Sequence, residues 1–131
     1  MAPLVITSFY AALLALLMAV LSTAASVQRG KHNIVLGDGG EPSLALAIRR
    51  FGNLAEYAAM AVVMLALMEL AGVDSWWLHA YGSALVALRL LHPFMLFERT
   101  DAPLWQKAGR FVAAAGTAAL LCAAAITLLV S

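Results

Sequence analysis

Residues 4–27 read LVITSFYAALLALLMAVLSTAASV, a run of 24 residues without a charged side chain. A helix of about 20 apolar residues spans the hydrocarbon core of a bilayer, which is roughly 30 Å thick. Three further apolar runs of comparable length follow, at residues 44–71, 76–97 and 105–130. The sequence therefore predicts an all-α fold, a bundle of four transmembrane helices.

The composition is typical of an integral membrane protein. Of the 131 residues, 64% are hydrophobic and only 11% are charged, which is more apolar than soluble domains usually are. The net charge of +1 and the lack of a basic tract argue against nucleic-acid binding. Because no internal repeat or low-complexity linker interrupts the chain, residues 1–131 are expected to form a single domain.

The first apolar run has an alternative interpretation as a secretory signal, because Ala24, Ala25 and Ser26 resemble a cleavage site. No Lys or Arg precedes this run, however, and it is longer than the apolar core of a signal peptide. We therefore interpret it as a membrane helix. In the last run, many alanines together with Gly109 and Gly116 predict close packing against a neighbouring helix.

The basic residues predict how the chain is oriented in the membrane. Apart from Arg89, all basic residues flank or follow the first and third connections (Arg29, Lys31, Arg49, Arg50, Arg99, Lys107 and Arg110). Neither the termini nor the second connection carries a Lys or Arg. Because cytoplasmic loops are enriched in Lys and Arg, both termini are expected on the non-cytoplasmic side. In a bacterium, the membrane would be the inner membrane.

The first connection contains the glycine-rich stretch LGDGG at residues 36–40, followed by Pro42 near the start of the second helix. It matches neither a dinucleotide fingerprint nor a P-loop, so we interpret it as a tight turn. Asp74 or Ser75 can cap the third helix. The three histidines are too scattered for a metal site, and Cys122 stands alone in the last apolar run, so no metal is expected.

Polar residues recur at helical spacing inside two of the apolar runs. Arg49, Asn53 and Glu56 fall on one helix face, and Tyr57 borders it. The third run carries a second polar set, Arg89 and His92, and the fourth run carries Arg110. The predicted topology places these residues in the same half of the membrane as the first set.

Charged side chains near the centre of a membrane helix cost about 3 kcal/mol each, so they usually face a partner or a wet cavity. One interpretation is that Glu56 pairs with Arg89 or Arg49 only to neutralise charge between helices. Several guanidinium groups nevertheless share this depth with one acid, and the surplus positive charge indicates an anionic ligand. Arginine binds carboxylates in a planar fork, and a nearby guanidinium can lower the pKa of a thiol, so a ligand with carboxylates and a thiol would fit.

These residues carry a resemblance to a known family. The stretch LGDGG at 36–40, IRRFGNLAEY at 48–57 and RLLH at 89–92 together resemble a bacterial member of the MAPEG family, the membrane-associated proteins in eicosanoid and glutathione metabolism. The resemblance covers nearly the whole chain, including the four helices. It implies a homotrimer that holds glutathione between adjacent subunits near the cytoplasmic face.

The resemblance also implies residue roles. Residues on the second and third helices would contact glutathione (Arg49, Asn53, Glu56, Tyr57, Arg89 and His92). Arg110 would be the candidate catalytic residue nearest the thiol. Arg29 would join the site from the end of the first helix, with Lys31 as an equal candidate.

The sequence departs from the family pattern in places. Leu96 stands where members with a glutathione site often carry a tyrosine, and Phe51 and Ala59 replace a His and a Pro that often frame the motif. Pro93 is expected to bend or interrupt the third helix.

Three functions remain open. The first is transfer of glutathione to a lipophilic electrophile, or reduction of a lipid hydroperoxide. The second is a non-catalytic protein that binds an anionic lipid or a lipid-like ligand in the same groove between subunits. The third, a small proton-coupled exporter, is disfavoured because the first helix contains no charge.

Overall fold

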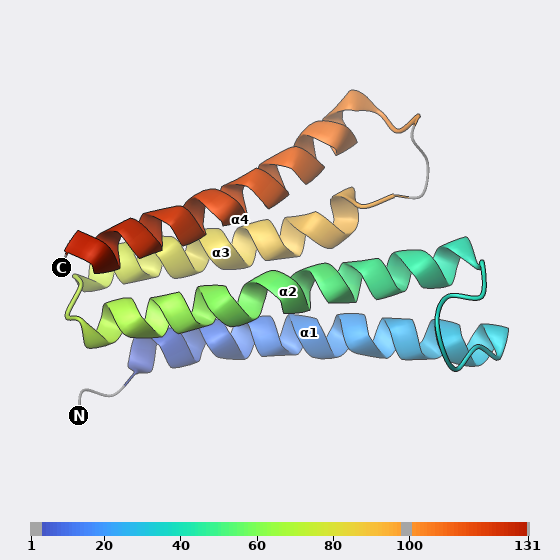
Figure 1. Ribbon diagram of the computed structural model, residues 1–131, viewed down its shortest axis with the longest axis horizontal. Helices are drawn as coiled ribbons and strands as arrows, with labels where there is room; N and C mark the ends of the chain where they lie inside the picture. The colour runs from blue at the N-terminus through green and yellow to red at the C-terminus, as the bar shows by residue number, and fades with distance from the viewer. Residues whose placement is uncertain (1–3, 98–100, 131) are drawn as a thin grey trace.

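The computed structural model describes residues 4–97 and 101–130. Four α-helices make up this part of the chain: α1 (Val5–His32), α2 (Pro42–Leu70), α3 (Ser75–Met95) and α4 (Leu104–Val130). The helices run lengthwise beside one another, and the start of α1, the α2–α3 turn and the end of α4 lie at one end (Figure 1). The α1–α2 connection and the start of α4 lie at the opposite end. The predicted all-α, four-helix fold is thus confirmed.

Within the described residues, α1, α2 and α4 are each long and apolar enough to cross a membrane. α3 is not among them: it has 21 residues and contains Arg89 and His92. At a rise of 1.5 Å per residue it still measures about 31 Å, close to the thickness of the hydrocarbon core. α3 therefore has the length to lie beside the other three helices across the bilayer, although its polar residues need shielding by them.

The helix ends follow from local sequence. Pro42 occupies the first turn of α2, where a missing backbone N–H costs nothing. Asp74 Oδ1 accepts a hydrogen bond from the Trp76 N–H at 2.9 Å, which confirms the expected cap of α3. α1 continues to His32, five residues past its expected end at Val27, and ends where Asn33 adopts a left-handed conformation. α3 ends at Met95, two residues after Pro93.

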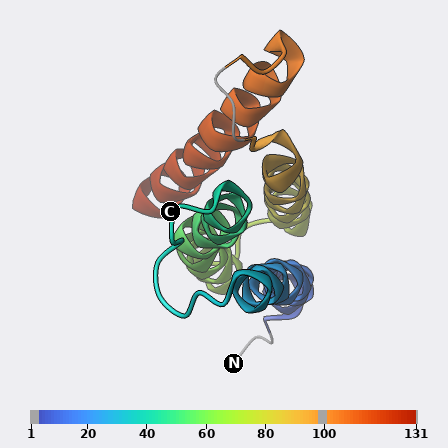
Figure 2. The ribbon, with the colours of Figure 1, turned by 90° about the vertical axis from the view of Figure 1, so that its right-hand side faces the viewer.

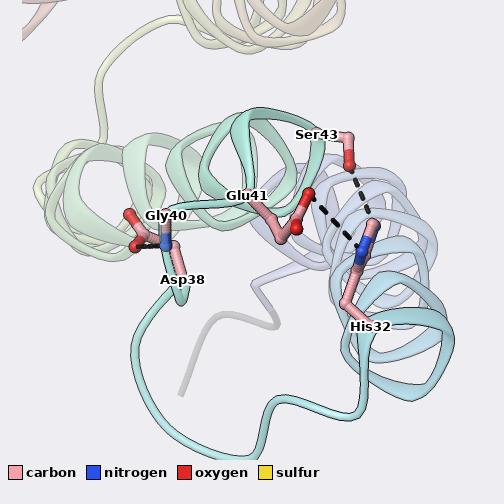
Figure 3. Close-up of polar contacts among 5 residues, drawn as sticks. All are labelled: His32, Asp38, Gly40, Glu41 and Ser43. Atoms are coloured by element: carbon pink, nitrogen blue, oxygen red, sulfur yellow. Dashed lines mark hydrogen bonds and ion pairs between the residues drawn. The ribbon is translucent and has the colours of Figure 1, made fainter.

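The connection between α1 and α2, residues 33–41, is a loop that projects from the two helices (Figure 2). Gly37, Gly39 and Gly40 all have positive φ angles, as the glycine-rich sequence predicts. Figure 3 shows how side chains fix this turn: Asp38 Oδ1 accepts from the Gly40 N–H at 3.0 Å. His32 Nδ1 lies 3.5 Å from a carboxylate oxygen of Glu41, and His32 Nε2 lies 3.2 Å from the hydroxyl of Ser43 (Figure 3). These contacts join the end of α1 to the start of α2.

The core lies between the helices and is mainly aliphatic, with Leu65 and Leu85 fully buried. α1 meets α3 where the ring of Tyr10 lies directly against Gly82, and the Tyr10 hydroxyl is 3.0 Å from His79 Nδ1. Among the described residues, α1 makes no contact with α4. α1 and α4 therefore lie on opposite sides of the bundle, with α2 and α3 between them (Figure 2).

α4 lies close to α3 near the chain's C-terminus and diverges from it toward Leu104 (Figures 1 and 2). The small residues of α4 face the side chains of α3, as the sequence predicts. A Cβ atom added at Gly116 would lie 2.9 Å from Leu88, and one added at Gly109 would lie 2.6 Å from Met95. The divergence leaves space between α2, the end of α3 and the start of α4, and the candidate site lies there.

Candidate functional site

The polar stripe of α2 divides between two environments. Asn53 is buried and faces the interior of the bundle, whereas Arg49 and Glu56 are exposed on the protomer surface. Glu56 follows Pro42 by 14 residues, which places it about 21 Å along α2. A charged pair therefore lies on the outer surface of this helix at a depth where lipid would be expected.

Arg89 is the most deeply enclosed charged group of the described chain, with 1% of its surface exposed. Its Nη1 donates to Asn53 Oδ1 at 2.9 Å, and its Nη2 donates to the Ala113 carbonyl at 2.7 Å. The Thr117 hydroxyl donates to the same carbonyl at 2.8 Å. Through these bonds one guanidinium ties α2, α3 and α4 together, and it lies 5.6 Å from the centre of the Tyr57 ring.

The ion pair on the outer surface is formed by Arg49 and Glu56. Arg49 Nη1 lies 3.4 Å from Glu56 Oε1, and the two side chains are 61% and 54% exposed. Of the two expected partners, Glu56 therefore pairs with Arg49 and not with Arg89. Tyr57 is also exposed, so one side of its ring is covered by Arg89 while the other is accessible.

A cleft of about 350 Å³ opens beside this pair, with Arg49 on one wall and Arg110 on another. The remaining walls are apolar and come from the start of α2 and from the two residues that follow α3 (Pro42, Ala45, Leu46, Leu96 and Phe97). The buried ring of His92 lies nearby, within the electrostatic reach of Arg49, Arg89 and Arg110. Three cations from three helices thus lie near His92, an arrangement that the predicted topology allows.

Arg29 contacts the α1–α2 connection and not the cleft. Its Nη1 donates to the carbonyls of Val35 at 3.1 Å and Gly37 at 2.8 Å, so it braces the α1–α2 connection. Arg29 does not line the cleft of Arg49 and Arg110 within the protomer. A contact between Arg29 and a ligand would have to come from a neighbouring subunit or follow a change in this turn.

Arg50, one of the surplus basic residues at this depth, makes a contact that the sequence did not predict. Its Nη2 donates to the Leu96 carbonyl at 3.0 Å and thereby caps the end of α3. Because α3 ends at Met95 and Leu96 has an extended backbone, the Leu96 carbonyl has no helical partner, and a nearby guanidinium is a suitable donor. The adjacent arginines at 49 and 50 are the sequence signal for two separate contacts, because neighbouring residues on a helix point in different directions.

Comparison with known proteins gives matches at two levels. The model of the MAPEG family matches residues 7–130. The inner membrane protein YecN of Escherichia coli strain K12 is 35% identical over 104 residues, which cover 79% of this chain and 78% of YecN. YecN of Escherichia coli O6:H1 strain CFT073 matches to the same extent. No solved structure gives a significant match.

Proposed function

Because the chain belongs to the MAPEG family, we propose that it is an inner membrane protein that binds glutathione between neighbouring subunits of a homotrimer. The inner-membrane location is supported by the printed name of its relative YecN. The family name itself refers to glutathione metabolism, and the polar residues of this chain suit that ligand.

The observation that carries this proposal is the exposed Arg49–Glu56 pair at membrane depth. Each charge would cost about 3 kcal/mol if it faced lipid, so the pair needs a polar or protein cover. A neighbouring subunit and an anionic ligand would supply that cover together. The adjacent cleft contains Arg110, so the ligand would meet at least two guanidinium groups.

Glutathione matches this arrangement group by group. A carboxylate would pair with Arg49, Glu56 would accept a hydrogen bond from its ammonium group, and Arg110 would lie nearest the thiol. Tyr57 would border the ligand through its exposed ring face. We assign Asn53 and Arg89 mainly to positioning, because their bonds to each other and to α4 hold the surrounding side chains.

We propose that the reaction is attack of the glutathione sulfur on a lipophilic electrophile. A guanidinium near the sulfur favours the thiolate, which forms a carbon–sulfur bond while the leaving group departs with the displaced electron pair. With a lipid hydroperoxide, two glutathione molecules would supply two electrons and yield an alcohol, water and glutathione disulfide. A membrane site concentrates the lipophilic substrate beside the thiol.

The test is calorimetric titration of glutathione into the detergent-solubilised full chain. We expect saturable binding that weakens at least tenfold in Arg49→Ala and in Glu56→Ala. Lys107→Ala is the matched control, since it removes an exposed cation of α4 that does not line the cleft. Absence of saturable binding, or equal binding by all variants, would refute the proposal.

The apolar walls of the cleft favour a second candidate function. Leu46, Leu96 and Phe97 line it without offering a hydroxyl group. A non-catalytic protein that holds an anionic lipid in this position would use the same cations. Turnover of a panel of electrophiles and hydroperoxides with glutathione distinguishes the two, because a binding protein would show occupancy without product.

A further inference from the structure

The loop between α1 and α2 exposes two adjacent apolar side chains. Val35 is 93% exposed and Leu36 is 91% exposed, and no other large apolar side chain of the described residues is exposed to that extent. The preceding residue, Ile34, packs within the loop instead, since a Cβ atom added at Gly39 would lie 2.5 Å from its Cδ1. The loop thus uses one apolar residue for its own packing and presents the next two to its surroundings.

Arg29 fixes the conformation of this part of the loop. Its Nη1 donates to the carbonyls of Val35 and Gly37, which lie on either side of Leu36 in the chain. A backbone carbonyl that leaves water needs a hydrogen-bond donor in exchange. Because both neighbouring carbonyls are paired, the Leu36 side chain can enter a less polar environment at a lower cost than in an unsupported loop.

The contact with Arg29 also determines the depth of the loop. Arg29 lies two residues beyond Val27, where the first apolar run ends, and therefore about 3 Å further along α1. From the ends of the helices the loop bends back toward the level of the last turns of α1 (Figure 1), and it projects sideways beyond the helices (Figure 2). It therefore lies beside the bundle, near the boundary between headgroups and hydrocarbon.

The charges around the loop do not favour attraction to an anionic surface. Arg29 and Lys31 are offset by two acids, Asp38 and Glu41. The imidazole of His32 lies 3.5 Å from the carboxylate of Glu41 (Figure 3). With two cations against two acids, the loop creates little long-range field. Binding to any surface would therefore depend on the two apolar side chains.

We propose that this loop is an anchor to the membrane surface, in which Val35 and Leu36 insert into the lipid leaflet at this end of the bundle. Two side chains bury too little area for a specific protein interface, which needs about 800 Å² on each partner. A lipid surface has no such requirement, because apolar side chains insert at the boundary of headgroups and acyl chains without a shaped pocket. Insertion would hold the end of α1 and the start of α2 at a fixed depth.

This inference goes beyond the proposed glutathione function. It does not depend on that function, because neither Val35 nor Leu36 lines the cleft of Arg49 and Arg110.

Quenching of a fluorescent label tests the anchor. The full chain with Leu36→Cys in a Cys122→Ser background is labelled with nitrobenzoxadiazole and reconstituted into phosphatidylcholine vesicles. Gly30→Cys gives the reference for depth, because nothing lies within 4 Å of a Cβ at this α1 position. We expect lipids with a nitroxide high on the acyl chain to quench the label at residue 36 at least as strongly as at residue 30. Aqueous iodide should quench it at least threefold less than the free label.

The support from Arg29 is tested with the same label at residue 36. Arg29→Gln should reduce quenching by the nitroxide lipid at least twofold, because the loop carbonyls lose their donor. Lys31→Gln is the matched control, since these carbonyls bond to Arg29 and not to Lys31. It should leave the quenching unchanged.

Three outcomes would overturn the proposal. Strong quenching by iodide with none by the nitroxide lipid would place the loop in water. Protection from both quenchers would mean that a neighbouring subunit or another protein covers it. Quenching that appears only after addition of phosphatidylglycerol would replace apolar insertion by adsorption through charge. If Leu36→Cys fails to fold, Val35→Cys carries the same label at the adjacent exposed position, with the same expected results.

Discussion

Arg89 shows how one side chain can organise a polar centre inside an apolar bundle. Its guanidinium is enclosed between α2, α3 and α4 and is bonded to an amide oxygen and a backbone carbonyl. Neither acceptor carries a full charge, so the group is stabilised by hydrogen bonds and the Tyr57 ring rather than by a carboxylate. Its Nε is buried without a hydrogen-bond partner among the described residues, so the buried charge depends on these few contacts.

The first prediction concerns this buried pair. Arg89→Met should lower the free energy of unfolding by about 1–3 kcal/mol, because it leaves the buried Asn53 oxygen without its donor. Asn53→Leu should also destabilise, since it removes one acceptor from a buried charge. The double variant should lose less than the sum of the two single variants. Denaturant titration in mixed detergent micelles measures these values, with exposed Arg110→Met as the control.

Additive losses in that double-mutant cycle would contradict a direct Arg89–Asn53 interaction. An Arg110→Met variant as unstable as Arg89→Met would show that loss of a positive charge near the start of α4, and not loss of the buried hydrogen bonds, lowers the free energy of unfolding. Either result would remove the positioning role that we assign to Arg89.

The sequence predicts that these polar residues lie near one another, but it leaves open how they pair. Spacing placed Arg49, Asn53 and Glu56 on one stripe, and depth placed Arg89 nearby. It did not reveal that Asn53 turns inward to Arg89 while Glu56 turns outward to Arg49. A stripe from residue 49 to residue 56 covers nearly two turns, and which part of it faces a neighbour depends on how the helices cross.

At the scale of elements, the packing of α1 against α3 depends on one glycine. A Cβ atom added at Gly82 would overlap the ring of Tyr10. Tyr10 has little freedom to move, because its hydroxyl contacts both the Nδ1 and the carbonyl of His79. Close packing of small residues commonly sets the distance between membrane helices.

The second prediction is that Gly82→Ala destabilises the protein by about 1–3 kcal/mol through overpacking. Gly30→Ala is the matched control, since nothing lies within 4 Å of a Cβ at this α1 position. That control should be neutral or stabilise by up to about 1 kcal/mol, because alanine favours helix over glycine. Unfolding in mixed micelles compares the two variants, and a Gly82→Ala protein as stable as Gly30→Ala would exclude the tight contact.

The third prediction concerns the start of α1. The two carboxylate oxygens of Glu69 accept from the backbone N–H groups of Ile6 at 3.0 Å and Thr7 at 2.8 Å. An acidic side chain of α2 thus satisfies donors that a helix leaves unpaired at its N-terminus. Glu69→Gln should weaken this cap by about 1 kcal/mol and speed hydrogen exchange at residues 5–8. Unchanged exchange there, measured beside residues 14–17 as an internal reference, would argue against the cap.

Most elements could be predicted from apolar run length, proline and capping residues. The starts of α2 and α3 at Pro42 and Ser75 follow such local signals. The end of α1 could not, because the polar residues up to His32 were interpreted as a loop. Helix propensity carries α1 beyond the apolar run until Asn33 turns the chain, and polar composition alone does not end a helix.

At the scale of the whole molecule, the fold places the α1–α2 connection and the start of α4 at one end. The fourth prediction is that this end faces the cytoplasm, because the basic residues flanking the membrane gather there. In a Cys122→Ser background, Lys31→Cys should resist a membrane-impermeant maleimide added to spheroplasts, whereas Ser75→Cys should react. The reverse pattern would invert the orientation and place the cleft of Arg49 and Arg110 on the other side of the membrane.

The fifth prediction follows from the outward-facing ion pair of α2. A lone protomer would expose Arg49 and Glu56 to lipid along with Tyr57, at a depth where charge is costly. Assembly that covers this surface removes the cost, so the solubilised protein should have the mass of three protomers by native mass spectrometry. Arg49→Leu/Glu56→Leu removes both charges and should weaken the trimer, because an apolar surface is tolerated by lipid without a partner.

As a control, Trp105→Leu alters an exposed side chain at the start of α4 and should leave the mass unchanged. A monomeric parent protein, or a trimer that is indifferent to the loss of both charges, would mean that the pair is accommodated within one chain and that the ligand must be held without a neighbour.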